Sequence, residues 1–158
     1  MSGNVENLKL ERSTAVKIYN KASREIQEIL ISSFGKECFS GKIIDRIKTY
    51  EDAWNEADQE TRRDCEIFPT DTMDVVAYKK LKLIARVINQ GWIPDWDNSK
   101  QYKWFPYFDL SSGFGFSDSG YRYTCTRTAV GSRLCFQSEE NATYVGKQFT
   151  DIYKDFLT

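Results

Sequence analysis

The spacing of apolar and polar residues divides the chain into a helical first part, a strand-rich stretch and a final helix. The clearest periodicity lies over residues 71–90, where apolar side chains recur at helical spacing and Lys and Arg fill much of the opposite side. The apolar stripe consists of Met73, Ala77, Leu81, Ile84 and Ile88. The pattern therefore predicts an amphipathic helix over 71–90 that ends at Gly91.

Shorter helices are predicted nearer the N-terminus from apolar spacing and capping residues. One runs over about 13–19, and a second over 24–34 begins after Ser23 and ends before Gly35. Both are short amphipathic segments. They indicate helices before any strand.

Thr49 and Asp52 have the spacing of a capping box and predict another helix start. The segment that follows, over 55–70, is charged and weakly periodic, so we interpret it as a solvated connection with room for one helical turn.

Aromatic residues gather after position 91, and their alternation is typical of strands. Trp92 to Trp96 form a rigid apolar turn around Pro94. A strand is then predicted over 102–110, with Trp104 and Phe108 on one face and Lys103 and Tyr107 on the other.

Further strands are predicted to make an antiparallel meander. Phe114 and Phe116 share one side of the second strand, and Ser, Asp and Gly residues at 117–120 predict a turn. A third strand over 121–128 and a turn near Val130 bring the chain back through 133–136, which sets Cys125 opposite Cys135 if the turn is centred on Val130.

Ser138 is a suitable N-cap for a last helix, with Glu139 and Glu140 in its first turn. Its apolar stripe consists of Ala142, Val145, Phe149, Ile152 and Phe156. We expect this one amphipathic helix to cover a face of the sheet. The fold class is α+β, with N-terminal helices, an antiparallel β-meander and a covering C-terminal helix; 1–158 form a single domain in which 1–35 can be a helical extension and 92–158 hold the sheet and last helix.

Composition limits the classes of function. The 158 residues are 41% hydrophobic and 28% charged, and no apolar run is long enough to span a membrane. The polar N-terminus has no signal segment, so a cytoplasmic location is expected. The chain has 22 basic and 23 acidic residues, so it has no net positive charge that would attract phosphate backbones. Nucleic-acid binding is therefore possible but not favoured by charge.

Candidate chemistry is sparse. The chain has no histidine, so the usual imidazole base of a serine or cysteine nucleophile is missing. Its four cysteines form no CxxC pair, and we expect free thiols, no metal site and no cofactor. Carboxylate pairs such as Asp95 with Asp97 leave open an enzyme with a carboxylate-bound metal, but turn formation explains them without chemistry. We predict no catalytic residue and no enzyme.

The stretch from Gly113 to Phe116 reads GFGF and is similar to the core of the RNA-recognition-motif signature. That signature requires a basic residue before the first glycine and hydrophobic or aromatic residues afterwards, where this chain has Ser112, Ser117 and Ser119. We therefore interpret Phe114 and Phe116 as side chains that pack beneath a helix.

A string of sequence blocks resembles a family of small uncharacterised bacterial proteins found among prophage and mobile-element genes. The blocks are SFGKECF, DRIKTYEDA, GWIPDWDNSKQYKWFPYFDL, SGFGFS and VGSRLCFQSEENATYVGKQFTDIYKDFL. The resemblance covers the chain from about Ser33 onward. It implies no reaction, cofactor or site residue, and only favours an accessory or structural phage product that binds protein or nucleic acid.

Two hypotheses of function follow. The first is a non-catalytic binding or assembly module whose aromatic meander, helped by the turn of Trp92 and Trp96, meets a protein partner or another copy of itself, since interfaces favour Trp and Tyr. The second is a single-stranded nucleic-acid binder that stacks bases on sheet aromatics. The candidate binding residues are Trp92, Trp96, Tyr107, Tyr121, Arg122, Tyr123 and Arg133.

Overall fold

The computed structural model describes residues 10, 12–19, 21–39, 41–110, 113–122 and 132–158. The chain divides into two compact units, Met1–Lys42 and Ile43–Thr158, and each is described by itself.

The first unit holds two helices, α1 (Arg12–Tyr19) and α2 (Arg24–Phe34), followed by the 3-10 turn η1 (Lys36–Cys38). They confirm the helices expected over 13–19 and 24–34. The turn between them is fixed by Gln27, whose Nε2 donates hydrogen bonds to the carbonyls of Tyr19 at 2.9 Å and Ala22 at 3.3 Å. Gly35 ends α2 with φ +83°, a conformation that glycine adopts without steric cost.

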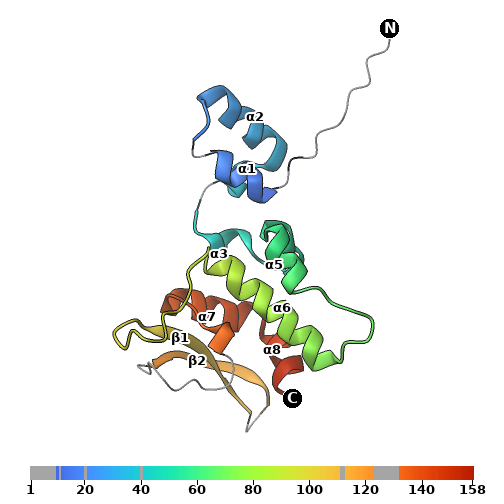
Figure 1. Ribbon diagram of the computed structural model, residues 1–158, viewed down its shortest axis with the longest axis vertical. Coiled ribbons are helices and arrows are strands. Elements are labelled where there is room, and N and C mark those ends of the chain that lie inside the picture. The colour runs from blue at the N-terminus through green and yellow to red at the C-terminus, as the bar shows by residue number, and fades with distance from the viewer. Residues whose placement is uncertain (1–9, 11, 20, 40, 111–112, 123–131) are drawn as a thin grey trace. The chain divides into compact units, whose positions relative to one another are not determined.

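The second unit begins with four helices (Figure 1). They are α3 (Ile43–Arg46), α4 (Tyr50–Glu56), α5 (Gln59–Asp64) and α6 (Met73–Ile88). The capping box is confirmed: the Thr49 hydroxyl accepts from the Asp52 N–H, and the Asp52 carboxylate accepts from the Thr49 N–H. The charged connection over 55–70 holds α5, which is capped by the Asp58 side chain.

Helix α6 supplies the centre of the core. Ala77, Leu81, Ile84 and Ile88 are buried, as the apolar stripe predicts. Met73 is an exception, because 70% of it is exposed. It is the first residue of α6 and follows the mostly exposed segment 68–72, so no neighbouring helix covers this end of the stripe.

Over the described residues the sheet is a two-stranded antiparallel hairpin of β1 (Lys103–Asp109) and β2 (Gly115–Arg122). The turn predicted over 117–120 is wrong, because β2 runs through these residues and the hairpin turns before Gly115. Cross-strand pairing overrides the local turn tendency: Ser119 pairs with Pro106, and Gly120 pairs with Phe105. The ladder shifts register between Tyr107 and Phe108, which lets Phe108 pair with Phe116.

The segment after β2 returns to the hairpin. A 3-10 turn, η2 (Ser132–Leu134), leads to Phe136, which forms an antiparallel bridge with Trp104 through two main-chain hydrogen bonds of 3.0 and 2.8 Å. The sequence pattern predicts that 133–136 return opposite the strand over 121–128, and it does not predict this bridge to β1. Most of the strand expected over 121–128 lies outside the residues that the structure describes, because the description stops at Arg122. Cys125 also lies outside them.

The single last helix is corrected to two, α7 (Glu139–Gln148) and α8 (Thr150–Leu157). At Phe149 the backbone leaves helical geometry (φ −116°, ψ 29°), while Thr150 Oγ1 donates to the Gly146 carbonyl at 2.7 Å. The break lets α7 cover both strands while α8 packs on α6. The N-cap is as predicted, since the Ser138 side chain accepts from the Asn141 N–H.

Aromatic rings fill the contact between hairpin and helices. Phe108 stacks on Phe114 at 5.1 Å between centroids, meets Phe116 edge-on at 6.0 Å and lies 4.6 Å from Tyr153 of α8. These contacts confirm that Phe114 and Phe116 pack beneath helices. Gly146 makes the close approach possible, because a Cβ built there lies 2.3 Å from the Phe116 ring and 2.8 Å from Pro106.

Candidate binding site

A hollow of about 790 Å³ lies in the second unit where α5, α6, the loop after α6 and the segment after β2 come together. Binding pockets for small ligands have volumes of this order, about 300–1,000 Å³. Its lining comprises Asp58, Glu60, Thr61, Lys82, Arg86, Asn89, Gly91, Trp92, Ile93, Pro94, Trp96, Arg133 and Cys135. Three of the candidates selected from the sequence, Trp92, Trp96 and Arg133, therefore share one site.

The apolar side of the hollow is the loop of residues 91–96. Trp92 and Trp96 are half-buried, whereas Ile93 between them is 80% exposed. Gly91 has φ +85°, which turns the chain sharply after α6, and the Trp92 N–H donates to the Asn89 carbonyl at 2.9 Å. The loop thus presents an exposed apolar side chain close in the sequence to two half-buried tryptophans.

The Lys103 side chain holds the end of this loop in place. Its side chain is 1% exposed, and Nζ donates to the main-chain carbonyls of Asp95 and Asn98 while lying 5.5 Å from the centroid of the Trp96 ring. Alternation along the strand places Lys103 on one of its faces, but does not show which loop folds over this first residue. The buried amine fixes the position of Trp96.

Asn89 joins α6 to the opposite wall. This residue is buried; its Nδ2 donates to the Cys135 carbonyl at 2.8 Å, and its Oδ1 accepts from the Gln137 N–H at 3.2 Å. Asn89 is not among the residues predicted from the sequence. A polar residue next to the buried end of an apolar stripe could have indicated such side-chain hydrogen bonds to another segment. These bonds set the segment that carries Arg133.

The basic residues of the hollow differ in how they are engaged. Arg86 pairs with Asp64 at 3.1 Å, and Lys82 Nζ donates to the Asp64 carbonyl at 3.1 Å. The hydrogen bond from Arg86 holds the pKa of the Asp64 carboxyl below its usual range. Arg133 is exposed and forms no ion pair within the described part of the chain.

Cys135 also lines the hollow, and its thiol is not activated. Burial raises the pKa of its thiol to about 11, so that the thiol stays protonated near neutral pH. Cys65 and Cys135 are buried free thiols, in agreement with the expectation for these two, and Cys38 is buried as well.

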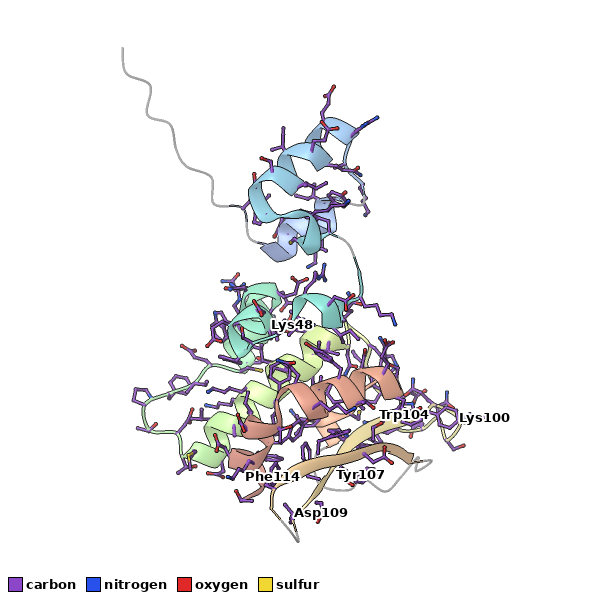
Figure 2. The ribbon with its side chains drawn as sticks, turned by 180° about the vertical axis from the view of Figure 1, so that it is seen from behind. Lys48, Lys100, Trp104, Tyr107, Asp109 and Phe114 are labelled. Atoms are coloured by element: carbon purple, nitrogen blue, oxygen red, sulfur yellow. The ribbon has the colours of Figure 1, made fainter. Side chains whose placement is uncertain are left out.

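The other candidates lie elsewhere. Tyr107 projects from the face of the hairpin away from the core, is 40% exposed, and covers Gly120 on the neighbouring strand (Figure 2). Tyr121 and Arg122 end β2 opposite Trp104 and Lys103, and their side chains, like all of Tyr123, lie outside what the structure describes.

Carboxylates of the acidic pairs in the sequence accept hydrogen bonds from main-chain N–H groups. Asp52 belongs to the capping box, and Asp95 Oδ1 accepts from the Asp97 N–H at 3.0 Å. Over the described ranges, no three His, Cys, Asp or Glu side chains are grouped so that they could hold a metal ion.

Comparisons with protein-family models, with curated proteins and with solved structures find no match to this chain. Among the helices that the structure describes, none has the length and apolar character needed to cross a membrane. The site must therefore be interpreted from its own geometry.

Proposed function

We propose that the chain is a non-catalytic binding module that holds a segment of a protein partner at the hollow of Trp92, Ile93, Trp96 and Arg133, called here the Trp92 hollow. The observation that carries the proposal is the exposure of Ile93, 80%, between two half-buried tryptophans. Burial of an exposed isoleucine is worth about 1.5–3 kcal/mol, which favours a partner that covers it.

The loop is organised in advance of binding. Lys103 donates hydrogen bonds to the carbonyl of Asp95 in the loop and to that of Asn98 just after it, and the Asp95 N–H donates to Gln101 Oε1 at 2.7 Å; these bonds hold the end of the loop. A loop that is already ordered loses little conformational entropy when a partner binds. Trp and Arg are also the residues that most often dominate the binding energy of protein interfaces.

The partner can be a different protein or another copy of the chain. A role among phage or mobile-element products, suggested by the sequence resemblance, belongs to this proposal, as does a cytoplasmic location. Neither changes the chemistry expected at the hollow, which is an apolar anchor beside an exposed arginine.

A single-stranded nucleic acid is the second candidate. It is favoured by the presence of Lys82, Arg86 and Arg133 in the same hollow as two indole rings, because bound single strands combine phosphate contacts with base stacking. It is disfavoured by Asp58 and Glu60 in the same lining and by the net charge of −1.

The test is selection of a displayed peptide library on the wild-type protein, followed by affinity measurement on Ile93→Glu. We expect selected peptides to bind the wild type and to lose at least about tenfold in affinity on Ile93→Glu, since covering Ile93 supplies on the order of 1.4 kcal/mol or more. Ile29→Glu is the matched control, because Ile29 is 64% exposed but belongs to α2 of the first unit and is not among the residues that line the hollow. It should leave the affinity unchanged.

Two further measurements complete the test. Sedimentation at increasing concentration detects self-association, which Ile93→Glu should abolish if the partner is a second copy. Oligonucleotide binding that falls with salt and is lost in Arg133→Ala would instead support the nucleic-acid candidate. A monomeric protein from which no Ile93-dependent peptide is selected would contradict the proposal.

A further inference from the structure

A second hollow, of about 490 Å³, lies beside the aromatic residues of α4. It is lined by Tyr50, Glu51, Trp54, Asn55, Glu66 and Ile67. The charged side chains of this lining are both carboxylates, Glu51 and Glu66, and both are exposed. We propose that this hollow, the Trp54 hollow, binds a basic side chain of a polypeptide partner, and that an arginine is its preferred occupant.

The two rings suit a cation. Tyr50 and Trp54 lie one helical turn apart on α4, with centroids 6.1 Å apart and ring planes at 49°. The face of an aromatic ring attracts a cation within about 6 Å, and tryptophan does so most strongly. Two tilted faces beside two carboxylates offer a guanidinium both a stacking surface and hydrogen-bond acceptors.

The chain already places cations against these rings. The Arg62 guanidinium carbon lies 6.0 Å from the centroid of Trp54, and Lys80 Nζ lies 5.4 Å from the centroid of Tyr50. Neither Arg62 nor Lys80 belongs to the lining of the hollow. The rings therefore hold cations supplied from within the fold, while the hollow presents carboxylates alone as its charged groups.

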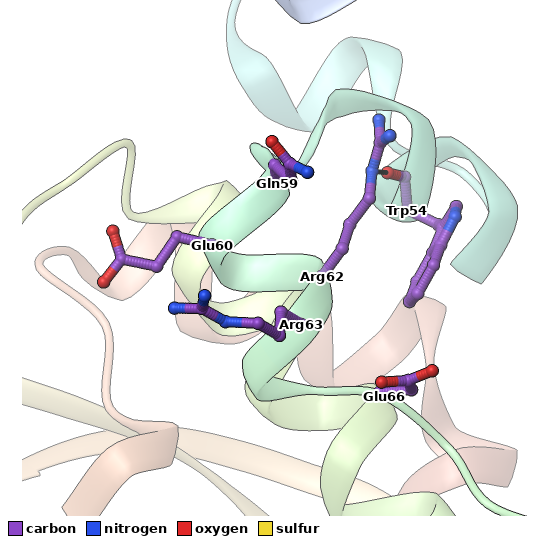
Figure 3. A pocket seen from close by; sticks show the side chains of 6 residues that line it. All are labelled: Trp54, Gln59, Glu60, Arg62, Arg63 and Glu66. Atoms are coloured by element: carbon purple, nitrogen blue, oxygen red, sulfur yellow. Dashed lines mark hydrogen bonds between the residues drawn. The ribbon is translucent and has the colours of Figure 1, made fainter.

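Arg62 is fixed in another role. Its Nε donates to the Trp54 carbonyl at 2.8 Å and its Nη2 to the Asn55 carbonyl at 3.0 Å, at the end of α4 where helix carbonyls lack partners. Figure 3 shows the guanidinium bonded to the Trp54 main chain and directed away from Glu66. Arg62 thus joins α5 to α4 and positions the indole without neutralising Glu66.

The neighbouring surface favours a polypeptide over a small free cation. A third hollow, of about 500 Å³, shares Trp54 and Glu66 with the Trp54 hollow and adds Gln59, Glu60, Arg62 and Arg63 (Figure 3). Glu60 also lines the Trp92 hollow. Each of these hollows therefore shares lining residues with the next, so a polypeptide bound at the Trp54 hollow has further depressions within reach, which a single ammonium ion cannot use.

The inference rests on side chains other than those of the Trp92 hollow and can fail independently of the proposed function. Its test uses the full chain labelled with 5-fluorotryptophan, which gives one fluorine resonance for each of the four tryptophans. The Trp54 resonance is assigned by its loss in Trp54→Phe. The probes are blocked tripeptides with a central arginine, lysine or citrulline between glycines.

We expect the arginine peptide to shift the Trp54 resonance saturably, in the millimolar range of a single side chain, and the neutral citrulline peptide to leave it in place. The double variant Glu51→Gln, Glu66→Gln should weaken arginine binding at least tenfold. Asp155→Asn, which removes an exposed carboxylate from α8, should not change it.

Equal binding of the arginine and citrulline peptides would overturn the cation assignment, and tighter binding of the lysine peptide would overturn the preference for arginine. A Trp54 resonance that does not move would overturn the site itself. Thermal unfolding of each variant verifies that the fold is kept, and Ile93→Glu, which alters the Trp92 hollow alone, should bind the arginine peptide like the wild type.

Discussion

The ammonium of Lys103, almost wholly enclosed by protein, donates a 2.9 Å hydrogen bond to the main-chain carbonyl of Asn98. The same nitrogen also donates a hydrogen bond to the carbonyl of Asp95 and lies over the Trp96 ring. A strand residue therefore determines the shape of the loop that precedes it, and with it one wall of the Trp92 hollow.

Replacement of Lys103 by methionine should destabilise the protein by about 1–3 kcal/mol, the usual cost of leaving a buried acceptor without its donor. Methionine keeps most of the side-chain volume, so the effect reports the lost hydrogen bonds. Urea unfolding measures it. Lys100→Met is the matched control, because Lys100 is exposed and its hydrogen bond to Asn98 comes from its main-chain N–H. An equal loss of stability in Lys100→Met and Lys103→Met would contradict a specific role of the Lys103 ammonium.

Replacement of Gly146 by alanine should cost about 1–3 kcal/mol, because the new methyl would meet the Phe116 ring and Pro106 at distances that no Cβ tolerates. The hairpin must then move away from α7. Thermal unfolding measures the loss. Gly115→Ala provides the comparison, since a Cβ there meets nothing within 4 Å, and it should be neutral or slightly stabilising.

Removal of the Thr49 hydroxyl in Thr49→Ala should destabilise α4 by about 0.5–2 kcal/mol, through loss of the bond to the Asp52 N–H. Thr72→Ala is a control at a second threonine N-cap, where the side chain bonds to Asp74 instead of the helix main chain. Chemical denaturation of both should show the larger loss for Thr49→Ala. Equal losses would indicate that the capping box contributes nothing specific.

Stability should fall at alkaline pH because of Cys135. Its ordinary pKa of 9.0 applies to the unfolded chain, whereas burial raises the folded pKa to about 11. Below pH 9 both states are protonated and the contribution is complete; as pH rises towards 11, the unfolded chain loses its proton and the folded one retains it, so the free energy of unfolding declines.

The measurement is urea unfolding of the wild type and Cys135→Ala at pH 8 and pH 10.5. The alanine variant is less stable at both values because a buried sulfur is lost, but its decline with pH should be smaller by about 1–2 kcal/mol. Identical declines would show that the thiol ionises alike in both states.

Much of the fold could be predicted because local signals agreed with packing. The helical stripe of α6 and the capping box at Thr49 depend on residues close in sequence, and both are present as predicted. The predicted turn over 117–120 failed because its Ser, Asp and Gly residues favour a turn only when nothing competes; pairing of Ser119 and Gly120 with β1 stabilises the extended form more strongly. The break at Phe149 was missed because the apolar stripe continues across it, although its two halves cover different elements.

The site was predicted less completely. Trp92, Trp96 and Arg133 were selected for their residue types, and they meet in one hollow. Periodicity alone places Lys82 and Arg86 on the solvent side of a helix; only the tertiary fold shows which part of that side faces the loop after Gly91. Trp54 lies in the helix that the capping box begins, and its place beside Glu66 depends on how α5 follows α4.

The covering of the hairpin by residues of α7 and α8 also has a consequence during synthesis. Phe116 lies under Gly146, and Phe108 lies 4.6 Å from the ring of Tyr153, so these phenylalanines acquire their cover only after residues 139–157 have left the ribosome. A nascent chain paused before that point exposes the apolar face of the hairpin, and we expect it to be held by molecular chaperones until the last two helices emerge.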